Sequence, residues 1–491
     1  MIRVMTTTQH SVLSIQKPLA LYIGGRWVEP TSDDTLPVIS PVTEEVVMSF
    51  AEAKEADMDR AVAAARDAFD NGPWPRMAAA ERAAHLREVA AALAARHEEL
   101  ADAWTTQVGA PISFTRYASG QPAGLFEYYA DVIESHPLVD ERHRDNGGLV
   151  RVVKEPVGVV ATITPWNAPL VLLCYKVAAA LAAGCTVVSK PAPETPADAY
   201  ILAECIEAAG IPAGVFNVVP AGREVGEHLV RHPGIDKIAF TGSTAAGRRI
   251  AAVAAERIAR VSLELGGKSA AVVLDDAEVG DVLASLVPFS MPITGQVCFS
   301  LTRVLVPTGR KQELLDAYVD AVQRVNVGDP FDEATQMGPL TMARQLDRVQ
   351  GYIAKGREEG ATLVTGGGRP EGFSRGYYVE PTVFDDVDTT MTIAQEEIFG
   401  PVVSFITYDG LDDAVAKAND TIYGLHGAIY SADPERGYDV ARRMRSGSVT
   451  VNGMIVDFKM PFGGFKQSGL GREGGLEGLD PYFEVKTVYF A

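Results

Sequence analysis

Residues 157–191 read VGVVATITPWNAPLVLLCYKVAAALAAGCTVVSKP, and this stretch decides the fold. The β-branched run VGVVATITP, 157–165, predicts a strand, and the alanine-rich run LVLLCYKVAAALAAG, 170–184, predicts a helix. CTVVSKP, 185–191, predicts a second strand. A strand, a helix and another strand in this order indicate a parallel β-α-β unit.

The same alternation continues on the C-terminal side of this unit. We expect a helix over 197–210, a strand over 214–220, a helix over 224–232, a strand over 236–242 and a helix over 244–259. Repeated β-α-β units predict a parallel sheet with helices on both faces. A second alternating stretch runs from near 260 to about 451, so the pattern predicts two α/β domains, and residues 51–103 are expected to be helical.

Length and charge limit the classes of protein to which the chain can belong. Its 491 residues allow about two to four domains. The 44 Lys and Arg residues against 64 Asp and Glu residues give a net charge of −20. Such an acidic chain repels phosphate backbones and anionic membrane surfaces, so we expect neither nucleic acid nor a membrane as a partner. A local basic groove can still hold one anionic cofactor.

The cysteines and the N-terminal residues favour a reducing compartment. The chain has four cysteines, Cys174, Cys185, Cys205 and Cys298. None form a CxxC pair, so we expect no metal site. The first residues contain no apolar core followed by a cleavage site. The most apolar run, 169–189, contains Lys176 and is interpreted as a buried helix leading into a strand. We therefore expect a cytoplasmic protein.

Two segments contain candidate catalytic side chains. Cys298, in GQVCFS, lies in an expected loop before the strand RVLVP, and its thiolate can attack an electrophilic carbon. Glu264, in SLELGGKSA, follows an apolar strand, where partial desolvation would raise its pKa to suit a general base. A small buried cysteine and an exposed glutamate are the alternatives. Gly266 and Gly267 permit a tight turn or a close approach of backbone to a ligand.

Three further segments have the residue types of an anion or cofactor site. In FTGSTAAGR, 240–248, Ser243 and Thr244 are natural N-caps, and the free N–H groups of the following helix suit a phosphate. Asn167, in TPWNAP, can donate its amide to a developing oxyanion. Lys190, at the end of a strand, lies where ligands bind open α/β sheets. A capped helix without a ligand, an ordinary turn and an exposed lysine are the alternatives.

Glycine-rich turns and a terminal strand are expected in the second half of the chain. EEIFGPVV contains Glu396 and Glu397 before a glycine–proline turn, and PFGGFKQSGLGRE, 461–473, is a glycine-rich loop. Either can be turn chemistry alone. PYFEVKTVYFA, 481–491, alternates apolar and polar residues and predicts a strand that pairs with a partner subunit. The segment 127–150 is a second piece that can reach outward.

Taken together, these motifs resemble the NAD(P)-dependent aldehyde dehydrogenase superfamily. The motifs keep one order along nearly the whole chain: TPWNAP, KPAPET, FTGSTAAGR, ELGGK, GQVC, EEIFGPV and PFGGFKQSG. Each motif alone is a weak signal, but seven in order are specific.

The resemblance implies roles for four catalytic residues. Cys298 is expected to form a thiohemiacetal with the aldehyde carbon and, after hydride transfer, a thioester. Asn167, with the backbone N–H of Cys298, is expected to form the oxyanion hole. Glu264 would activate the water that hydrolyses the thioester, and Lys176 would assist proton relay.

The resemblance also implies NAD as cofactor, with NADP possible. The cofactor-binding positions would be Thr164, Pro165, Trp166, Lys190, Gly222, Phe240, Gly242, Ser243, Leu265, Glu397 and Phe399. Many members have a glutamate where this chain has Pro193, so the preference for NAD over NADP loses its clearest support. The substrate-binding positions would be Ala168, Leu172, Tyr175, Phe299 and Phe462. Their apolar side chains suggest a hydrophobic aliphatic, aromatic or terpenoid aldehyde.

The fold implied by the resemblance is α/β, with a modified Rossmann cofactor domain, an α/β catalytic domain and a small β oligomerisation element. We expect the cofactor domain over 1–126 and 147–260, and the catalytic domain over 261–455. The oligomerisation element would comprise 127–146 and 476–491, with 456–475 returning to the cofactor domain. The assembly would be a homodimer or homotetramer formed through the C-terminal strand.

Three other functions were weighed against this one. A CoA-acylating dehydrogenase generally lacks the deacylating carboxylate that Glu264 supplies. A non-catalytic protein of the same fold has no reason to keep Cys298, Glu264 and Asn167 together. A cysteine hydrolase needs a histidine partner, and no histidine lies in a motif that suggests a dyad.

Overall fold

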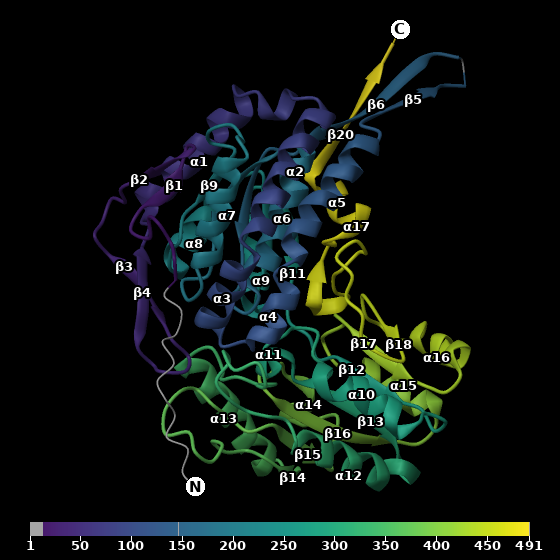
Figure 1. Cartoon of the computed structure of the whole chain (residues 1–491). Helices are drawn as coiled ribbons and strands as arrows, with labels where there is room; N and C mark the ends of the chain where they lie inside the picture. The colour runs from purple at the N-terminus through teal and green to yellow at the C-terminus, as the bar shows by residue number, and fades with distance from the viewer. Residues whose placement is uncertain (1–12, 146, 491) are drawn as a thin grey trace.

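The computed structural model describes residues 13–145 and 147–490, and it contains two α/β halves and a projecting arm (Figure 1). The first half is built on an eight-stranded sheet of order β19-β11-β10-β7-β8-β9-β1-β2. Its strands are β1 (Leu21–Ile23), β2 (Arg26–Val28), β7 (Val159–Ile163), β8 (Thr186–Lys190), β9 (Phe216–Val218), β10 (Lys237–Thr241), β11 (Arg260–Glu264) and β19 (Gly469–Leu470). Strands β7 to β11 are parallel, whereas β1, β2 and β19 are antiparallel to their neighbours.

Helices cover both faces of this sheet, as the alternation predicts. One face packs against α2 (Ala79–Ala95), α3 (His97–Val108), α5 (Gln121–Ser135), α6 (Pro169–Ala183) and α7 (Ala197–Ala208). The other face packs against α1 (Glu55–Asp70), α8 (Arg223–Arg231) and α9 (Thr244–Ala255). Every residue of α6 except Leu172 is buried, and the helix ends at Gly184, whose φ of +95° favours glycine. The most apolar run of the chain is therefore a core helix, as its sequence predicts.

The second half is built on a seven-stranded sheet of order β14-β15-β16-β13-β12-β17-β18. Its strands are β12 (Ala270–Val273), β13 (Arg303–Pro307), β14 (Thr362–Thr365), β15 (Thr382–Asp385), β16 (Val402–Tyr408), β17 (Gly427–Tyr430) and β18 (Thr450–Val451). One face packs against α10 (Val279–Ser290) and α12 (Lys311–Val322). The other packs against α13 (Ala343–Glu358), α14 (Thr392–Gln395), α15 (Leu411–Asn419) and α16 (Pro434–Ala441).

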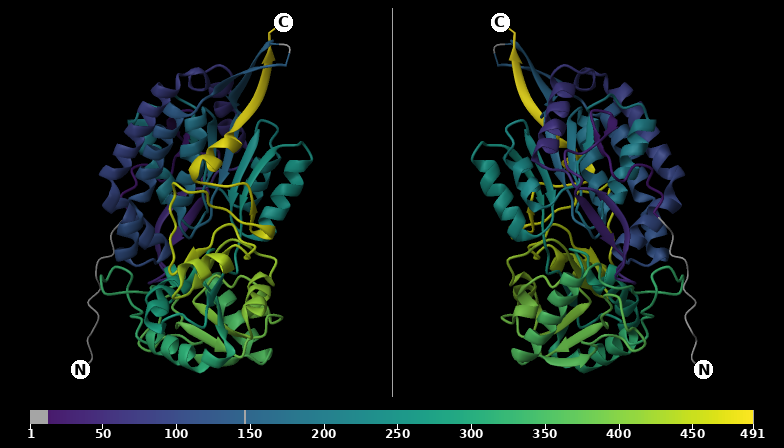
Figure 2. Two further views of the ribbon diagram at one scale, coloured as in Figure 1. Left: turned by 90° about the vertical axis from the view of Figure 1, so that its right-hand side faces the viewer. Right: turned by 90° about the vertical axis from the view of Figure 1, so that its left-hand side faces the viewer.

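The arm is a three-stranded antiparallel sheet that extends away from both halves (Figure 2). It contains β5 (Val139–His143), β6 (Leu149–Pro156) and β20 (Phe483–Tyr489), in the order β20-β6-β5. The apolar side chains of Val139, Val485 and Tyr489 are 49%, 63% and 67% exposed. Because β6 is the central strand of this sheet, the arm extends to Pro156, past the expected end of its first segment at residue 146.

The change from one sheet to the other falls later than the expected boundary at 260. Strand β11 pairs with β10 along its whole length, so it belongs to the first sheet. The chain enters the second sheet at β12, after Gly266 and Gly267. The apolar run continues across these glycines, which is why the alternation alone does not mark the switch.

Four N-terminal strands are present that the alternation does not predict. The hairpin of β1 and β2 turns at Gly24 and Gly25, whose φ values of +64° and +73° suit a tight turn. Strand β3 (Thr35–Ile39) pairs with β4 (Val46–Ala51) in a separate two-stranded sheet. Residues 1–12, 146 and 491, which the expected domains include, lie outside the described residues.

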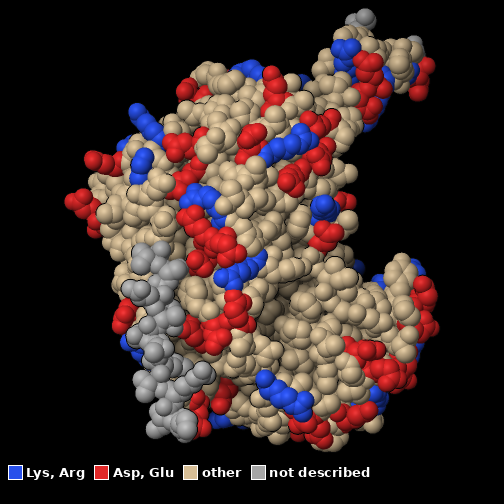
Figure 3. All heavy atoms as spheres, viewed as in Figure 1, with Lys and Arg blue, Asp and Glu red and all other residues tan. Residues whose placement is uncertain are grey.

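The surface carries acidic and basic side chains interspersed over the face drawn in Figure 3, which is recessed on the right between the two halves. Across residues 13–145 and 147–490, no helix has the length and apolar content needed to cross a bilayer. In the same residues, no cluster of three His, Cys, Asp or Glu side chains is arranged to hold a metal ion.

Candidate active site

Predicted site residues gather where the parallel strands of the first sheet end. The strand register places Ile163 beside Lys190 and beside Phe240, and Thr241 beside Glu264. Parallel strands end at one edge of a sheet, which is where open α/β sheets bind ligands. The turn after β7 (164–168), the end of β8, the turn after β10 and the end of β11 therefore meet at one edge, which faces the second half.

Cys298 is presented by an unusual turn. Ile293, Thr294 and Gly295 have consecutive φ values of +47°, +58° and +71°, and only the glycine adopts this region freely. A side chain at Gly295 would clash with the carbonyl of Gly400. Strained backbone of this kind persists where the surrounding structure fixes it, typically beside a functional group.

Gln296 holds this turn against the oxyanion candidate. Its buried side chain donates to the carbonyl of Ile293 at 3.0 Å and accepts from the N–H of Thr341 at 3.0 Å. The main-chain carbonyl of Gln296 accepts a hydrogen bond from the side-chain amide of Asn167 at 2.9 Å. The main-chain carbonyl of Asn167 in turn accepts from Trp104 Nε1 at 2.9 Å. The Asn167 amide is therefore fixed beside Cys298, and its second N–H is left for another acceptor.

The surroundings of Cys298 favour the thiol over the thiolate. Burial raises the pKa of the Cys298 thiol, and the charges of Glu397 and Glu264 raise it further. The backbone N–H groups of Cys298 and Phe299 act in the opposite direction. Because the thiolate is the nucleophile, the thiol proton must leave when the sulfur attacks.

Glu264 is a buried carboxyl without a partner. It is 3% exposed, and neither of its oxygens has a hydrogen-bond partner among the described residues. Burial raises the pKa of Glu264 well above its usual value, the neighbouring Glu473 raises it further, and Lys176 and Arg472 lower it. A free carboxyl with a raised pKa is suited to accept a proton.

Lys176 forms a buried ion pair that the sequence did not reveal. Its Nζ lies 2.6 Å from Glu473 Oε1, and the two side chains are 0% and 4% exposed. Lys176 Nζ also donates to Thr241 Oγ1 at 2.6 Å. Glu473 ends the glycine-rich loop 461–473, and no role was expected for it. The carboxyl of Glu264 thus lies near the ion pair between the Lys176 ammonium and the Glu473 carboxylate.

Lys190 lies at the end of β8, next to the N-terminus of α8. Its Nζ donates to the carbonyls of Pro191 and Ala221 at 3.1 and 3.0 Å. Burial lowers the pKa of Lys190 to about 8. A Cβ at Gly226 would lie 3.2 Å from the Lys190 side chain, so the glycine lets the lysine pack closely against α8. Gly222 is the N-cap of α8.

The N-terminus of α9 has the features of a phosphate site. Ser243 Oγ accepts from the N–H of Ala246 at 3.3 Å and caps the helix. The Phe240 ring lies over Gly242, where a Cβ would be 2.5 Å from it. Leu265 packs against Gly247, which has no room for a side chain. Both glycines therefore make room for the side chains of Phe240 and Leu265, and the free N–H groups of the first turn are what suits an anion.

At the other end of the same edge, residues of both halves meet. The rings of Trp166 and Phe399 are T-shaped with centroids 5.3 Å apart, and Phe399 has a φ of +63°. Glu397 Oε1 accepts from the N–H of Gly267 at 3.1 Å, and burial raises the pKa of Glu397 to about 7. Thr164 donates its backbone N–H to the carbonyl of Lys190 at 3.3 Å, and the half-buried Pro165 follows it.

The predicted substrate residues are apolar or aromatic, and several of them pack near Phe299, the neighbour of Cys298 in the chain. Phe299 and Phe462 have ring centroids 6.1 Å apart, and Ala168 packs against the same core as Phe299. Leu172 and Tyr175 lie on α6. Two residues near them were not predicted: Phe458 packs over Gly124, and His426 lies 6.3 Å from the Phe299 ring. Burial lowers the pKa of His426 to about 4, so its ring is neutral.

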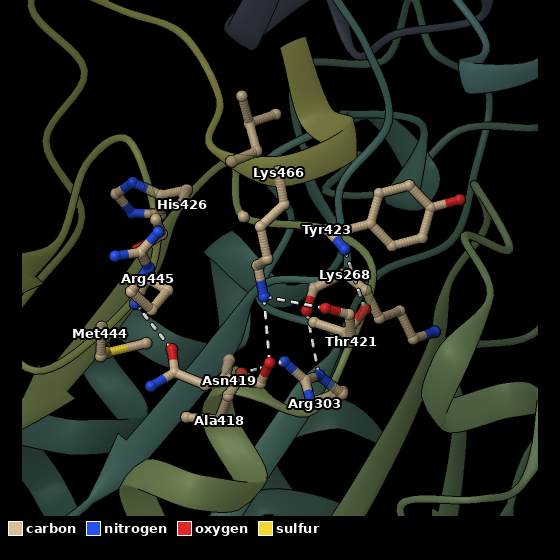
Figure 4. A pocket seen from close by; sticks show the side chains of 14 residues that line it. Lys268, Arg303, Ala418, Asn419, Thr421, Tyr423, His426, Met444, Arg445 and Lys466 are labelled. Carbon is tan, nitrogen blue, oxygen red and sulfur yellow. Dashed lines mark hydrogen bonds between the residues drawn. The ribbon is translucent and has the colours of Figure 1, made fainter. Parts of the chain in front are cut away.

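The loop that carries Phe462 is fixed at its far end (Figure 4). Ser468 Oγ donates to the carbonyl of Gly266 at 2.6 Å. Lys466 Nζ donates to the carbonyls of Asn419 and Thr421 at 3.0 and 2.8 Å. Arg303 donates to the carbonyl of Ala418 at 2.7 Å. Lys466 therefore ties the loop to the end of α15 and to the turn after it, whereas Lys268 Nζ in the same pocket is buried without a hydrogen-bond partner among the described residues.

The arrangement fits a nicotinamide dinucleotide. Two helix N-termini and a buried lysine suit the phosphates and ribose of a nucleotide. The T-shaped aromatic pair and Glu397 lie at the other end, next to Cys298.

Comparisons with known proteins agree with this geometry. The family model described as "Aldehyde dehydrogenase family" matches residues 27–488. Geranial dehydrogenase of Castellaniella defragrans is 47% identical over 96% of this chain and 98% of its own. A Mycobacterium tuberculosis aldehyde dehydrogenase complexed with NAD+ is 44% identical, with a TM-score of 0.94 over 96% of this chain and 98% of that one. Aldehyde dehydrogenase C of Pseudomonas syringae, complexed with NAD+ and octanal, is 40% identical, with a TM-score of 0.94 over 98% of both chains.

These findings confirm the α/β fold class and the NAD(P) cofactor expected from the resemblance. The chain belongs to the aldehyde dehydrogenase family and is an NAD(P)-dependent aldehyde dehydrogenase.

Proposed function

We propose that the chain oxidises a hydrophobic aldehyde to its carboxylic acid, with Cys298 as nucleophile. The observation that carries the proposal is the convergence of three groups. They are the Cys298 thiol, the Asn167 amide fixed by Gln296, and the unpartnered carboxyl of Glu264.

The first step is attack by sulfur on the aldehyde carbon. Glu264 accepts the thiol proton as the carbon–sulfur bond forms, and the carbonyl oxygen becomes an alkoxide. That oxygen is stabilised by the free N–H of the Asn167 amide and by the backbone N–H of Cys298. Because Trp104 and Gln296 already hold Asn167, the donor needs little reorganisation when charge develops.

The nicotinamide ring, when bound, supplies the acceptor of the hydride that leaves the substrate carbon. Glu397, Phe399 and Trp166 are proposed to place it beside Cys298, and Thr164, Pro165 and Leu265 to line the crevice. Lys190, Phe240 and Gly222 would hold the adenosine part, with Gly242 and Ser243 at the pyrophosphate.

The second half of the reaction removes the acyl group from sulfur. Glu264 first passes the thiol proton to Lys176 and Glu473, whose ion pair adjoins it and is proposed to carry protons away. It then takes a proton from water as the water oxygen attacks the thioester carbon, and the carbon–sulfur bond breaks to release the Cys298 thiolate. The presence of Glu264 favours water over coenzyme A as the acyl acceptor.

The proposed substrates are hydrophobic aliphatic or terpenoid aldehydes. The residues around Cys298 are Ala168, Leu172, Tyr175, Phe299 and Phe462, and none is charged. A relative 47% identical is a geranial dehydrogenase, and a solved relative 40% identical holds octanal. The small Ala168, which precedes α6, leaves room for a branched chain.

The test is a steady-state panel of acetaldehyde, octanal, geranial and benzaldehyde, each with NAD and with NADP. We expect the highest kcat/KM for octanal or geranial, in reactions that do not require coenzyme A. Cys298→Ala should abolish aldehyde-dependent nicotinamide reduction, whereas Cys205→Ala, at another buried cysteine, should retain it. Full activity in Cys298→Ala would refute the mechanism.

We also propose an assembly and a location. The first sheet with its helices would bind the cofactor, the second would supply Cys298, and β20 would join subunits into a homodimer or homotetramer. The exposed Val485 and Tyr489 on an edge strand support this role of β20. The four cysteines are all unpaired, which favours the cytoplasm.

A further inference from the structure

One ion pair joins the two halves beside the proposed cofactor site. Arg344 Nη2 lies 2.5 Å from Glu194 Oε1. Glu194 belongs to the loop that follows β8 and Lys190, in the first half. Arg344 lies in the first turn of α13, in the second half. The arginine side chain is 67% exposed and the glutamate 21%, so the pair lies at the rim of the crevice.

The first turns of α13 are fixed along this crevice. Gln345 Nε2 donates to the carbonyl of Phe399 at 2.6 Å, and Arg348 Nε donates to the carbonyl of Ile398 at 3.2 Å. Phe399 contacts Trp166 at the proposed nicotinamide end. Arg344, next to Gln345, reaches in the other direction, toward the loop that follows Lys190. The backbone of Arg344 is therefore held in place while its exposed side chain can change partner.

Two cations, Lys190 and Arg344, lie close to Glu194. Lys190 donates only to backbone carbonyls, and Pro193 brings no charge. Glu194 raises the pKa of Lys190 against the effect of burial, so it is near enough to interact with the lysine. Its one close ion-pair partner among the described residues is Arg344. Two cations thus share one carboxylate beside the proposed adenine ribose.

A ribose 2′-hydroxyl needs no second cation beside Lys190, whereas a 2′-phosphate is stabilised by one. A phosphate monoester carries nearly two negative charges and binds arginine through paired hydrogen bonds. Glu194 would repel that phosphate unless its charge stayed neutralised or its loop moved aside. The same guanidinium can therefore serve either the carboxylate or the phosphate.

We propose that Arg344 is the residue through which the chain accepts NADP as well as NAD. It exchanges Glu194 for the 2′-phosphate, and Glu194 sets the preference because it competes for the guanidinium. This inference rests on the proposed placement of the adenine ribose at Lys190.

The first test measures binding without turnover. Isothermal titration calorimetry compares 5′-AMP with 2′,5′-ADP (adenosine 2′,5′-bisphosphate), which differ only in the 2′-phosphate. Arg344→Ala should weaken the binding of 2′,5′-ADP relative to that of 5′-AMP by about tenfold, because a charge-assisted pair of bonds is lost. Glu194→Gln should shift the ratio the opposite way, and Arg344→Lys should recover part of the loss. Arg357→Ala, about 20 Å away on the same exposed helix, is the matched control and should leave the ratio as in wild type.

The second test measures the ratio of kcat/KM for NADP and NAD, which should fall by about tenfold in Arg344→Ala. An equal loss for both cofactors would show that the pair is only a tie between the halves, and the proposal would be wrong. A wild type that binds 5′-AMP but rejects 2′,5′-ADP, with no gain in Glu194→Gln, would also overturn it. If 5′-AMP does not bind at all, the proposed cofactor site itself fails.

Discussion

Replacing Glu473 by Gln should lower the pKa of the Glu264 carboxyl. After burial, the charge of Glu473 is the largest cause that raises this pKa, and it is larger than the opposing effect of Lys176. The variant removes that charge and leaves the ammonium of Lys176. The pKa of Glu264 falls whether Lys176 then stays charged or loses its proton, because the larger of the two opposing effects has been removed.

The magnitude follows from the geometry of the buried pair. Two unit charges 2.6 Å apart attract by about 6 kcal/mol at an effective dielectric constant of about 20. Removing one partner of a buried pair costs about 3–5 kcal/mol of stability. One pKa unit corresponds to about 1.4 kcal/mol. A shift of about one unit in the pKa of Glu264 therefore needs only about a quarter of the attraction between Lys176 and Glu473.

The assay is the pH dependence of thioester hydrolysis in single-turnover experiments, with urea denaturation alongside. The acidic limb of the profile should move to lower pH by about one unit, and the rate at neutral pH should fall because the proposed relay is cut. The double variant Lys176→Met/Glu473→Gln should recover stability, since no uncompensated charge remains. An acidic limb that stays in place or moves to higher pH would refute the assignment of Glu264 as base.

Three further changes test other parts of the site and the assembly. Glu264→Gln should stop turnover and yet raise the free energy of unfolding at pH 7. A carboxyl whose folded pKa is raised loses stability as pH rises from its unfolded value near 4.3, so the gain should vanish below about pH 4 in urea titrations. Ala168→Phe should lower kcat/KM for geranial by about tenfold relative to acetaldehyde, and an equal loss for both would contradict a role in size selection. Val485→Asp should reduce the molar mass measured by light scattering, and an unaltered mass would place the subunit contact elsewhere.

Local sequence patterns predict the elements of the first sheet and their caps. The runs around β7, α6 and β8 have the periodicities of strand, helix and strand, and Ser243 caps α9 as its sequence indicates. The hairpin of β1 and β2 has a glycine pair at its turn, a signal that the search for β-α-β alternation passes over. These features depend on neighbours in the chain, which is why sequence reaches them.

The contacts that fix the catalytic groups depend on residues far apart in the chain. Asn167 meets the carbonyl of Gln296 only after both halves have folded, and Trp104 lies in a helix with no motif. Glu473 pairs with Lys176 although 297 positions separate them. Patterns of spacing within one segment cannot encode such pairs, so sequence predicts the reacting groups and misses the side chains that orient them.

The anchorage of the loop that carries Phe462 has a consequence for how specificity changes among related enzymes. Lys466 and Ser468 tie the loop to α15 and to the glycines after β11, and Phe462 takes no part in either tie. A substitution at Phe462 can therefore reshape the mouth of the site while the main chain keeps its path. Mutational drift can broaden or narrow the range of accepted aldehydes there without disturbing the nearby base.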